Sequence, residues 1–303
     1  MENIIFIHKG DSWYLPYALC QCIKSNPSAR VILLGDDANK KYNNIVEHQL
    51  IEDYSIEADD FSKLYKHYST QPYDYELFCI QRWFIWLNFM NENNLDYALL
   101  PDTDVLIFED ISLYFKHIQK PFDFTKGESN YMGFVYMNRE SLTKICNFIN
   151  DVYKAETKTG NLKSMYEKYR KVEKYGGISD ISLFCYYEEL HKPKNVINTE
   201  SNSMDNRLFI HSMQSKLFQH DTQHYVKISN VKGLYYVKQK DVLYSVIGMH
   251  CFGSQKILIL KYYTGDNAWK AHIKYYWKIS YVHSLIVFIR KYIRTKKQRN
   301  LLN

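Results

Sequence analysis

Two carboxylates stand in the middle of a long apolar stretch, the segment Leu99-Leu100-Pro101-Asp102-Thr103-Asp104-Val105-Leu106-Ile107-Phe108. The apolar runs on both sides are typical of buried strands, so we expect the pair where a strand ends at the edge of a sheet. Carboxylate oxygens prefer hard divalent cations, and such a cation can in turn hold a diphosphate. An Asp-x-Asp pair also occurs by chance at an ordinary strand end with a turn, so the pair alone does not establish a metal site.

A second motif far downstream follows another expected strand and reads His250-x-x-Gly253-x-x-Lys256. The neutral imidazole of His250 is suited to be a third ligand of Mn²⁺ beside two carboxylates. Gly253 would let the backbone approach a phosphate closely, and Lys256 could neutralise a diphosphate leaving group. A lone histidine after a strand is more often structural, but the two motifs together are more specific than either one.

The elements around the carboxylates alternate between strands and helices. Strands are expected at residues 4–8, 30–34, 46–51 and 97–100, and helices at 13–24, 58–67 and 76–91. This alternation predicts an α/β fold with a Rossmann-like, mostly parallel sheet. Ligands of such sheets bind at the carboxyl ends of the strands, which is where Asp102 and Asp104 are expected. Asp11 or Ser12 is the expected N-cap of the first helix.

The spacing of these motifs resembles that of the GT-A glycosyltransferases, especially the family-eight type. The segment Glu76-Leu77-Phe78-Cys79-Ile80-Gln81-Arg82-Trp83-Phe84 is also similar to the segment that precedes the Asp-x-Asp motif in related bacterial enzymes. The resemblance covers residues 1–260 and implies a GT-A (Rossmann-like), mostly parallel sheet flanked by helices. It further implies metal-dependent transfer of a sugar from a nucleotide-sugar, usually UDP-linked, to an acceptor hydroxyl.

The resemblance assigns roles to the residues of both motifs. Asp102 and Asp104, with Thr103 between them, match the metal-binding pair, and His250 matches the third ligand. Gly253 and Lys256 match the contacts to the diphosphate. The implied cofactor is Mn²⁺ or Mg²⁺, with a UDP-sugar as the donor substrate. Family-eight enzymes often follow the lysine with Pro-Trp, where this chain has isoleucine and leucine, so the retaining course of that family is an expectation.

The loops after the first two strands are candidates for binding the nucleotide. His8 and Lys9 follow the first strand, where GT-A enzymes hold uracil and ribose. Asp36 ends the second strand and could meet the base or ribose, or simply solvate a turn. Ser129 and Asn130 precede a later expected strand and could hydrogen-bond the donor sugar, although a plain surface loop explains them equally well.

Two further charged residues are candidates for catalysis. Arg82 lies on the helix before the carboxylate pair and could contact the donor phosphate or sugar, or form an ion pair on a half-buried helix. Asp180 follows two glycines where a helix begins and could face an acceptor or donor hydroxyl. Ser179 or Asp180 could instead cap that helix. The resemblance favours a functional Asp180, because GT-A enzymes often place a carboxylate at the start of such a helix.

Composition indicates an ordinary globular chain of 303 residues, 46% hydrophobic and 24% charged. We expect a catalytic domain at 1–266, with a nucleotide-binding half at 1–110 and an acceptor half at 111–266, followed by an amphipathic helix at 267–303. Six scattered cysteines without a Cys-x-x-Cys pair favour a reduced, cytoplasmic setting. The first residues resemble a strand more than a signal peptide, and there is no transmembrane-length apolar run.

The C-terminal segment differs in charge from the rest of the chain. No acidic residue follows Asp266, and removing the nine Lys and Arg residues of 267–303 from the net charge of +6 leaves −3. Aromatic residues share one face of the expected helix, which is typical of an interfacial helix on an anionic membrane. The alternative is a helix packed on the core with a solvated basic end. The apolar residues at 282–289 and the acidic body argue against nucleic acid as the partner.

The leading hypothesis is therefore a sugar transferase, peripheral on the inner face of a membrane. It would build a surface glycan, lipopolysaccharide or capsule, on a glycan or lipid-linked acceptor. A sugar-nucleotide nucleotidyltransferase is the first alternative, but it usually needs a glycine-rich basic loop after the first strand, and His8-Lys9-Gly10-Asp11 matches this poorly. A non-enzymatic binding protein with a basic tail is the second.

Overall fold

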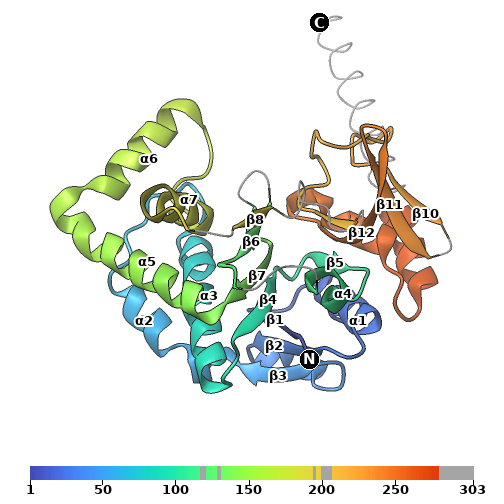
Figure 1. Cartoon of the computed structure of the whole chain (residues 1–303), viewed down its shortest axis with the longest axis horizontal. Coiled ribbons are helices and arrows are strands. Elements are labelled where there is room, and N and C mark those ends of the chain that lie inside the picture. The colour runs from blue at the N-terminus through green and yellow to red at the C-terminus, as the bar shows by residue number, and fades with distance from the viewer. Residues whose placement is uncertain (117–120, 128–130, 194–195, 199–206, 232, 280–303) are drawn as a thin grey trace, which may run out of the picture.

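The computed structural model describes residues 1–116, 121–127, 131–193, 196–198, 207–231 and 233–279 (Figure 1). Its central sheet has the strand order β3-β2-β1-β4-β7. These strands are β1 (Asn3–His8), β2 (Arg30–Gly35), β3 (Glu47–Leu50), β4 (Tyr97–Pro101) and β7 (Phe134–Asn138). The first four are parallel, and only β7 runs antiparallel to its neighbour β4 within this sheet. The predicted α/β class with a mostly parallel sheet is confirmed.

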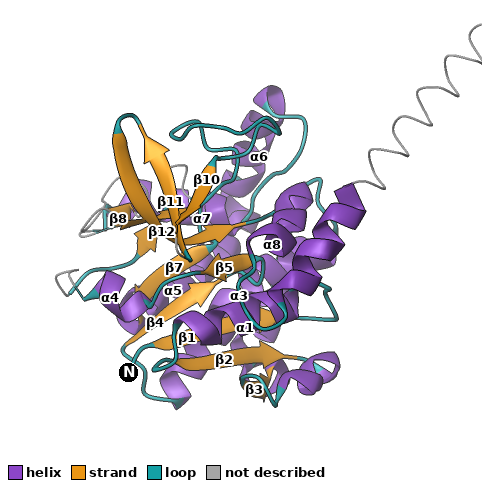
Figure 2. Ribbon diagram, turned by 90° about the vertical axis from the view of Figure 1, so that its right-hand side faces the viewer, coloured by secondary structure: helices purple, strands orange, loops and turns teal. Residues whose placement is uncertain are grey.

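A second sheet lies beside the first and is mainly antiparallel, in the order β10-β11-β12-β5, with β9 pairing in parallel with β12. Figure 2 shows it above the stacked strands of the central sheet. Its strands are β5 (Val105–Ile107), β9 (Arg207–Ile210), β10 (Ile228–Val231), β11 (Leu234–Gln239) and β12 (Val242–His250). Two short strands, β6 (Thr125–Lys126) and β8 (Ile197–Asn198), form a separate parallel pair.

Helices cover both faces of the central sheet. They are α1 (Leu15–Ser25), α2 (Ile56–Ser62), α3 (Tyr73–Glu92), α4 (Ile111–Phe115), α5 (Arg139–Thr159), α6 (Asn161–Val172), α7 (Asp180–His191) and α8 (Ile257–Tyr262), with 3₁₀ turns η1 (Asp37–Tyr42), η2 (Ile51–Tyr54) and η3 (Gly253–Lys256). Alternate side chains of β1 enter different clusters: Ile5 packs with α2, α3, α5 and α7, and Ile4 packs with α1 and α4. Burial on both faces explains why the parallel strands read as continuous apolar runs.

The long helix α3 is fixed to the sheet by its aromatic residues. Trp83 and Trp86 are fully buried, and the Nε1–H of Trp86 donates to the carbonyl of Ile5 in β1 at 3.1 Å. The helix therefore lies directly over the strand that neighbours β4. This packing places Arg82 of α3 next to the end of β4, where the two carboxylates begin.

Several predicted boundaries were wrong. Helix α1 begins at Leu15 without a side-chain cap, because Pro16 in its first turn sets the start in place of Asp11 or Ser12. The helix expected over 58–67 ends at Ser62, and the chain turns so that the ring of Tyr65 packs against Tyr153. At α7 the cap is Ser179, which confirms one of the two predicted caps, and Asp180 is the first helical residue.

The C-terminal part is described only as far as residue 279. Residues 268–279 are helical, in agreement with the expected C-terminal helix, and 280–303 lie outside the described residues, as do Ser129 and Asn130. Within the described part of the chain, no helix has the length and apolar character needed to cross a membrane. The division of the catalytic part at residue 110 stays a prediction.

Candidate active site

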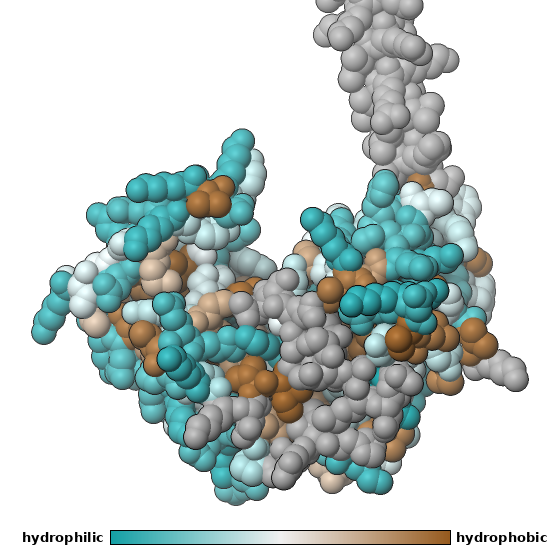
Figure 3. All heavy atoms as spheres, turned by 45° about the horizontal axis from the view of Figure 1, so that its top comes forward, coloured by the Kyte–Doolittle hydropathy of each residue, from teal (hydrophilic) through white to brown (hydrophobic). Residues whose placement is uncertain are grey.

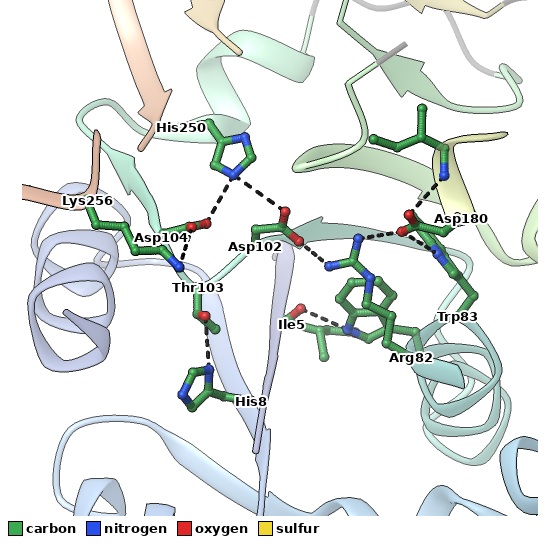
Figure 4. A network of polar contacts seen from close by, with 12 residues as sticks. Ile5, His8, Arg82, Trp83, Asp102, Thr103, Asp104, Asp180, His250 and Lys256 are labelled. Atoms are coloured by element: carbon green, nitrogen blue, oxygen red, sulfur yellow. Dashed lines mark hydrogen bonds and ion pairs between the residues drawn. The ribbon is translucent and has the colours of Figure 1, made fainter. Parts of the chain in front are cut away.

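The Asp102–Asp104 segment passes from one sheet to the other. It leaves β4 of the central sheet and enters β5 of the second sheet, and hydrogen bonds from both sides hold it in place. The N–H of Asp102 donates to the carbonyl of Gly133 at 2.8 Å, and the N–H of Cys251 donates to the carbonyl of Asp104 at 2.9 Å. The pairing of His250 with Val105 brings the end of β12 alongside. The two sequence motifs therefore meet at one point (Figure 4).

Three side chains at this point form a set of metal-ligand atoms. The Nε2 atom of His250 lies 3.1 Å from Oδ1 of Asp104 and 3.5 Å from Oδ2 of Asp102. One ligand atom from each residue lies within 4.8 Å of the others, and Asp104 and His250 are buried. Two carboxylates and an imidazole fit Mn²⁺, and the carboxylates also fit Mg²⁺. The structure brings the three predicted ligands together, and their role as ligands stays a prediction.

A glycine makes room for the histidine. A Cβ atom at Gly133 would lie 2.6 Å from both Cε1 and Nδ1 of the His250 ring and 3.1 Å from Oδ2 of Asp102. Real Cβ atoms do not come so close to another side chain. The His250 ring can therefore occupy this position only because residue 133 is a glycine. Sequence reasoning missed this role of Gly133, whose only signal was its place just before an expected strand.

Lys256 reaches the other side of the carboxylate pair. Its Nζ atom lies 3.2 Å from Oδ2 of Asp104 and 3.3 Å from the hydroxyl of Tyr14, over whose ring it also packs at 4.5 Å. Gly253 has a φ of +56°, and no heavy atom comes within 4 Å of where its Cβ would be, so the backbone here faces open space. Sequence reasoning missed Tyr14, although the loop after β1 was expected at this same edge of the sheet.

The charges of this cluster balance one another. Burial tends to raise the pKa of Asp104, but the positive charges of His250 and Lys256 outweigh burial and lower it. Burial tends to lower the pKa of His250, and the carboxylates of Asp104 and Asp102 raise it overall. Lys256 follows the same pattern: burial opposes its charge, and Asp104 and Tyr14 raise its pKa. The basic side chains around the acidic pair thus offset its negative charge.

Arg82 and Asp180, the two candidates for catalysis, lie on the opposite side of Asp102. Arg82 forms an ion pair with Oδ1 of Asp102 through Nη1, and its Nη2 donates to Oδ2 of Asp180 at 2.7 Å. Trp83, which sequence reasoning did not single out, donates its Nε1–H to the same Asp180 oxygen at 3.2 Å. Burial tends to lower the pKa of Arg82, but the two carboxylates raise it well above its usual range.

The predicted nucleotide-binding residues lie on the loops around β1 and β2. Nδ1 of His8 lies 3.0 Å from the hydroxyl of Thr103, and burial lowers the pKa of His8, which keeps the ring neutral. Asp36 accepts the N–H of Gly10 at 2.6 Å and caps η1, so it has the turn-forming role that was its alternative. The Lys9 ammonium lies 4.6 Å from the centre of the Phe78 ring.

Figure 3 shows the surface of the molecule, with a hollow between the side that carries α6 and the side that carries β10–β12.

Protein-family models do not match the chain, and curated proteins do not either. The chain is structurally similar to glycosyltransferases. The matches include mouse xyloside xylosyltransferase 1, at 8% identity and a TM-score of 0.47 over 68% of this chain and 87% of that one.

Two further structures match as well. The galactosyltransferase LgtC, in complex with donor and acceptor sugar analogues, has 13% identity and a TM-score of 0.46 over 90% of this chain and 95% of LgtC. The glycosyltransferase GlyE of Streptococcus pneumoniae has 15% identity and a TM-score of 0.36, over 65% of this chain and 44% of GlyE. With TM-scores below 0.5, these similarities do not assign an activity to the chain.

Proposed function

We propose that the protein is a metal-dependent glycosyltransferase that moves a sugar from a UDP-sugar to an acceptor hydroxyl. The observation that carries the proposal is the convergence of Asp102, Asp104 and His250 on one point, with the Lys256 ammonium at its edge. A departing nucleoside diphosphate develops negative charge on its phosphate oxygens. A fixed set of metal ligands with an adjacent lysine is suited to stabilise that charge where it develops.

Each residue of the cluster has a part in this proposal. Asp102, Asp104 and His250 hold Mn²⁺ or Mg²⁺, which supplies Lewis-acid stabilisation of the leaving diphosphate when bound. Lys256 turns from Asp104 to the phosphates, and the open backbone at Gly253 lets them come close. On the other side, the neutral His8 and its partner Thr103 face the nucleoside. The loop residues Lys9 and Asp36 shape that end of the site.

The finer features of the reaction are also proposals. We take the transfer to be retaining and the acceptor to be a glycan or lipid-linked glycan of a surface polymer, such as lipopolysaccharide or capsule. The exposed surface described below supports an acceptor held at a membrane. Ser129 and Asn130 belong to the same proposal as contacts of the donor sugar.

A donor screen tests the activity. The full chain is incubated with individual nucleotide-sugars with and without Mn²⁺, and released nucleoside diphosphate is measured. We expect Mn²⁺-dependent turnover of at least one UDP-sugar and a loss of about 100-fold or more in Asp104→Asn, comparable to removing a main stabiliser of transition-state charge. The matched control is Asp37→Asn, a carboxylate on the surface turn η1 that pairs with Lys40. Turnover that survives Asp104→Asn would refute the metal site.

The proposed membrane contact is a surface we name the aromatic–lysine face. Residues 268–279 bury Ala271 and Tyr275 against the core and expose large side chains on the outside, with Trp277 74% and Trp269 61% exposed. Lys278 from this helix lies with its Nζ atom 4.1 Å from the centre of the Trp13 ring, which extends the surface to the N-terminal part. The face comprises Trp13, Trp269, Lys270, Ile273, Lys274, Tyr276, Trp277 and Lys278.

Aromatic rings beside lysines are the composition of an interfacial surface on anionic lipid, because the rings enter the headgroup region and the ammonium groups meet lipid phosphates. The test is co-sedimentation with phosphatidylcholine vesicles that contain phosphatidylglycerol or lack it. We expect the wild type to prefer the anionic vesicles and Trp269→Gln/Trp277→Gln to bind them less. Val172→Gln/Tyr175→Gln removes two exposed apolar residues elsewhere and serves as the control. Equal binding by both double variants would contradict the proposed surface.

A further inference from the structure

Asp180 is held by hydrogen bonds on both of its oxygens. Its Oδ2 accepts Arg82 Nη2 at 2.7 Å and Trp83 Nε1 at 3.2 Å, and its Oδ1 accepts the backbone N–H of Ile181 at 2.9 Å. The residue is 5% exposed and opens helix α7, whose start is fixed by the capping box of Ser179. A carboxylate bound by three donors at a helix N-terminus is a fixed anchor, not a group prepared to take a proton or attack a sugar.

Arg82 connects this anchor to the metal site. Its guanidinium contacts Asp102 through Nη1 and Asp180 through Nη2, and its centre lies 5.3 Å from the rings of Trp83 and of Trp86. A planar guanidinium can bind two carboxylates at once, which an ammonium group cannot do in the same fixed geometry. The tryptophans limit its movement, so the position of Asp180 determines the position of Arg82.

The orientation of Asp102 follows from this contact. Arg82 takes Oδ1, so Oδ2 is the oxygen that faces Nε2 of His250 at 3.5 Å. Figure 4 shows the chain of contacts from Asp180 through Arg82 to Asp102 and on to His250. Partners that orient a ligating carboxylate are worth about 10- to 100-fold in metal affinity.

We propose that Asp180 and Arg82 are positioning residues, which orient Asp102 and thereby set the affinity of the site for its metal ion. The inference rests on the proposed metal site and goes beyond it, because it assigns the buried acid of α7 to metal binding and not to proton transfer or attack on the donor.

The test measures Mn²⁺ binding directly, by titration of the full chain without nucleotide and with free Mn²⁺ followed by electron paramagnetic resonance. We expect Asp180→Asn to weaken Mn²⁺ binding about 10- to 100-fold, as for other partners of ligating carboxylates. Arg82→Lys should weaken Mn²⁺ binding by a similar factor. The double variant should bind Mn²⁺ no more weakly than the single variant with the lower affinity, because both residues act through one contact. Raising the Mn²⁺ concentration should recover at least part of any turnover that Asp180→Asn loses.

The control is Glu76→Gln. Glu76 is a buried carboxylate on α3 that accepts a hydrogen bond from the Ser69 hydroxyl at 2.7 Å and does not bond to the metal site. Unchanged Mn²⁺ affinity in both Asp180→Asn and Arg82→Lys would overturn the positioning role. A turnover loss of about 1000-fold that excess Mn²⁺ does not restore would also overturn it and indicate a catalytic Asp180. Wild-type protein that binds no Mn²⁺ would refute the metal site itself, and the positioning role with it. Thermal unfolding of each variant identifies any that fails to fold, in which case the other single variant decides.

Discussion

Replacing Lys256 with methionine should change the binding of metal and of nucleotide in opposite directions. The Lys256 ammonium lies 3.2 Å from Oδ2 of Asp104. A divalent cation at Asp104 must displace or repel this charge, so its loss should favour metal binding. A bound nucleoside diphosphate needs the same ammonium for its phosphates, so its loss should weaken nucleotide binding.

The expected size follows from the geometry. Two unit charges 3.2 Å apart attract by about 5 kcal/mol at an effective dielectric constant of 20. The side chain of Lys256 is 31% exposed, so water replaces much of this attraction, and a hydrogen bond between charged groups retains about 1.5–3 kcal/mol. The lower end of this range corresponds to about tenfold in a binding constant. Mn²⁺ alone should therefore bind about tenfold more tightly to Lys256→Met, and UDP should bind at least about tenfold more weakly at saturating Mn²⁺.

Both constants can be measured by calorimetric titration of the same samples. The matched control is Lys261→Met, which removes a lysine from the next helix, α8, where it pairs with Asp221 at 3.5 Å. We expect the control to leave both constants unchanged. Weaker Mn²⁺ binding in Lys256→Met, or UDP binding equal to the wild type, would show that Lys256 does not alternate between Asp104 and the diphosphate.

Two further predictions concern the histidine ligand. Gly133→Ala should weaken Mn²⁺ binding and lower the free energy of unfolding by about 1–3 kcal/mol, because the added Cβ would overlap the His250 ring. The stability loss should vanish when His250→Ala is also present. Chemical denaturation of the wild type, the two single variants and the double variant checks this. Mn²⁺ affinity should fall as the pH is lowered. Asp104 and Asp102 raise the pKa of His250. At pH values below this pKa the imidazole carries a second proton, which must leave before the ring can bind the metal. The affinity should level off above the His250 pKa, and a pH-independent affinity between pH 6 and 8 would contradict this reasoning.

The meeting of the two motifs could be predicted from the sequence because it depends on simple rules. Parallel strands end at one edge of a sheet, so residues after β1 and β4 were expected together, and the histidine motif was placed by its resemblance to a family. The roles of Gly133 and Tyr14 could not be predicted in this way. They depend on the register of β12 against β5 and on how one ring packs on another, which hydrophobic periodicity does not specify. The same is true of the connection from Asp180 to Asp102, because residues 78 positions apart meet only through an arginine on a third element.

The short pairing of β5 with β12 has a consequence for folding. Only three residue pairs define it, and β12 carries an irregularity between Val246 and Gly248 where it pairs with β9. Successive side chains of a strand point to opposite faces, so a slip of one residue would turn His250 away from the carboxylates and bring Met249 in its place. A single-residue deletion in β12 would therefore abolish Mn²⁺ binding even if every strand still formed. Metal affinity thus reports whether the C-terminal sheet has reached its correct alignment, which spectroscopic measures of strand content cannot detect.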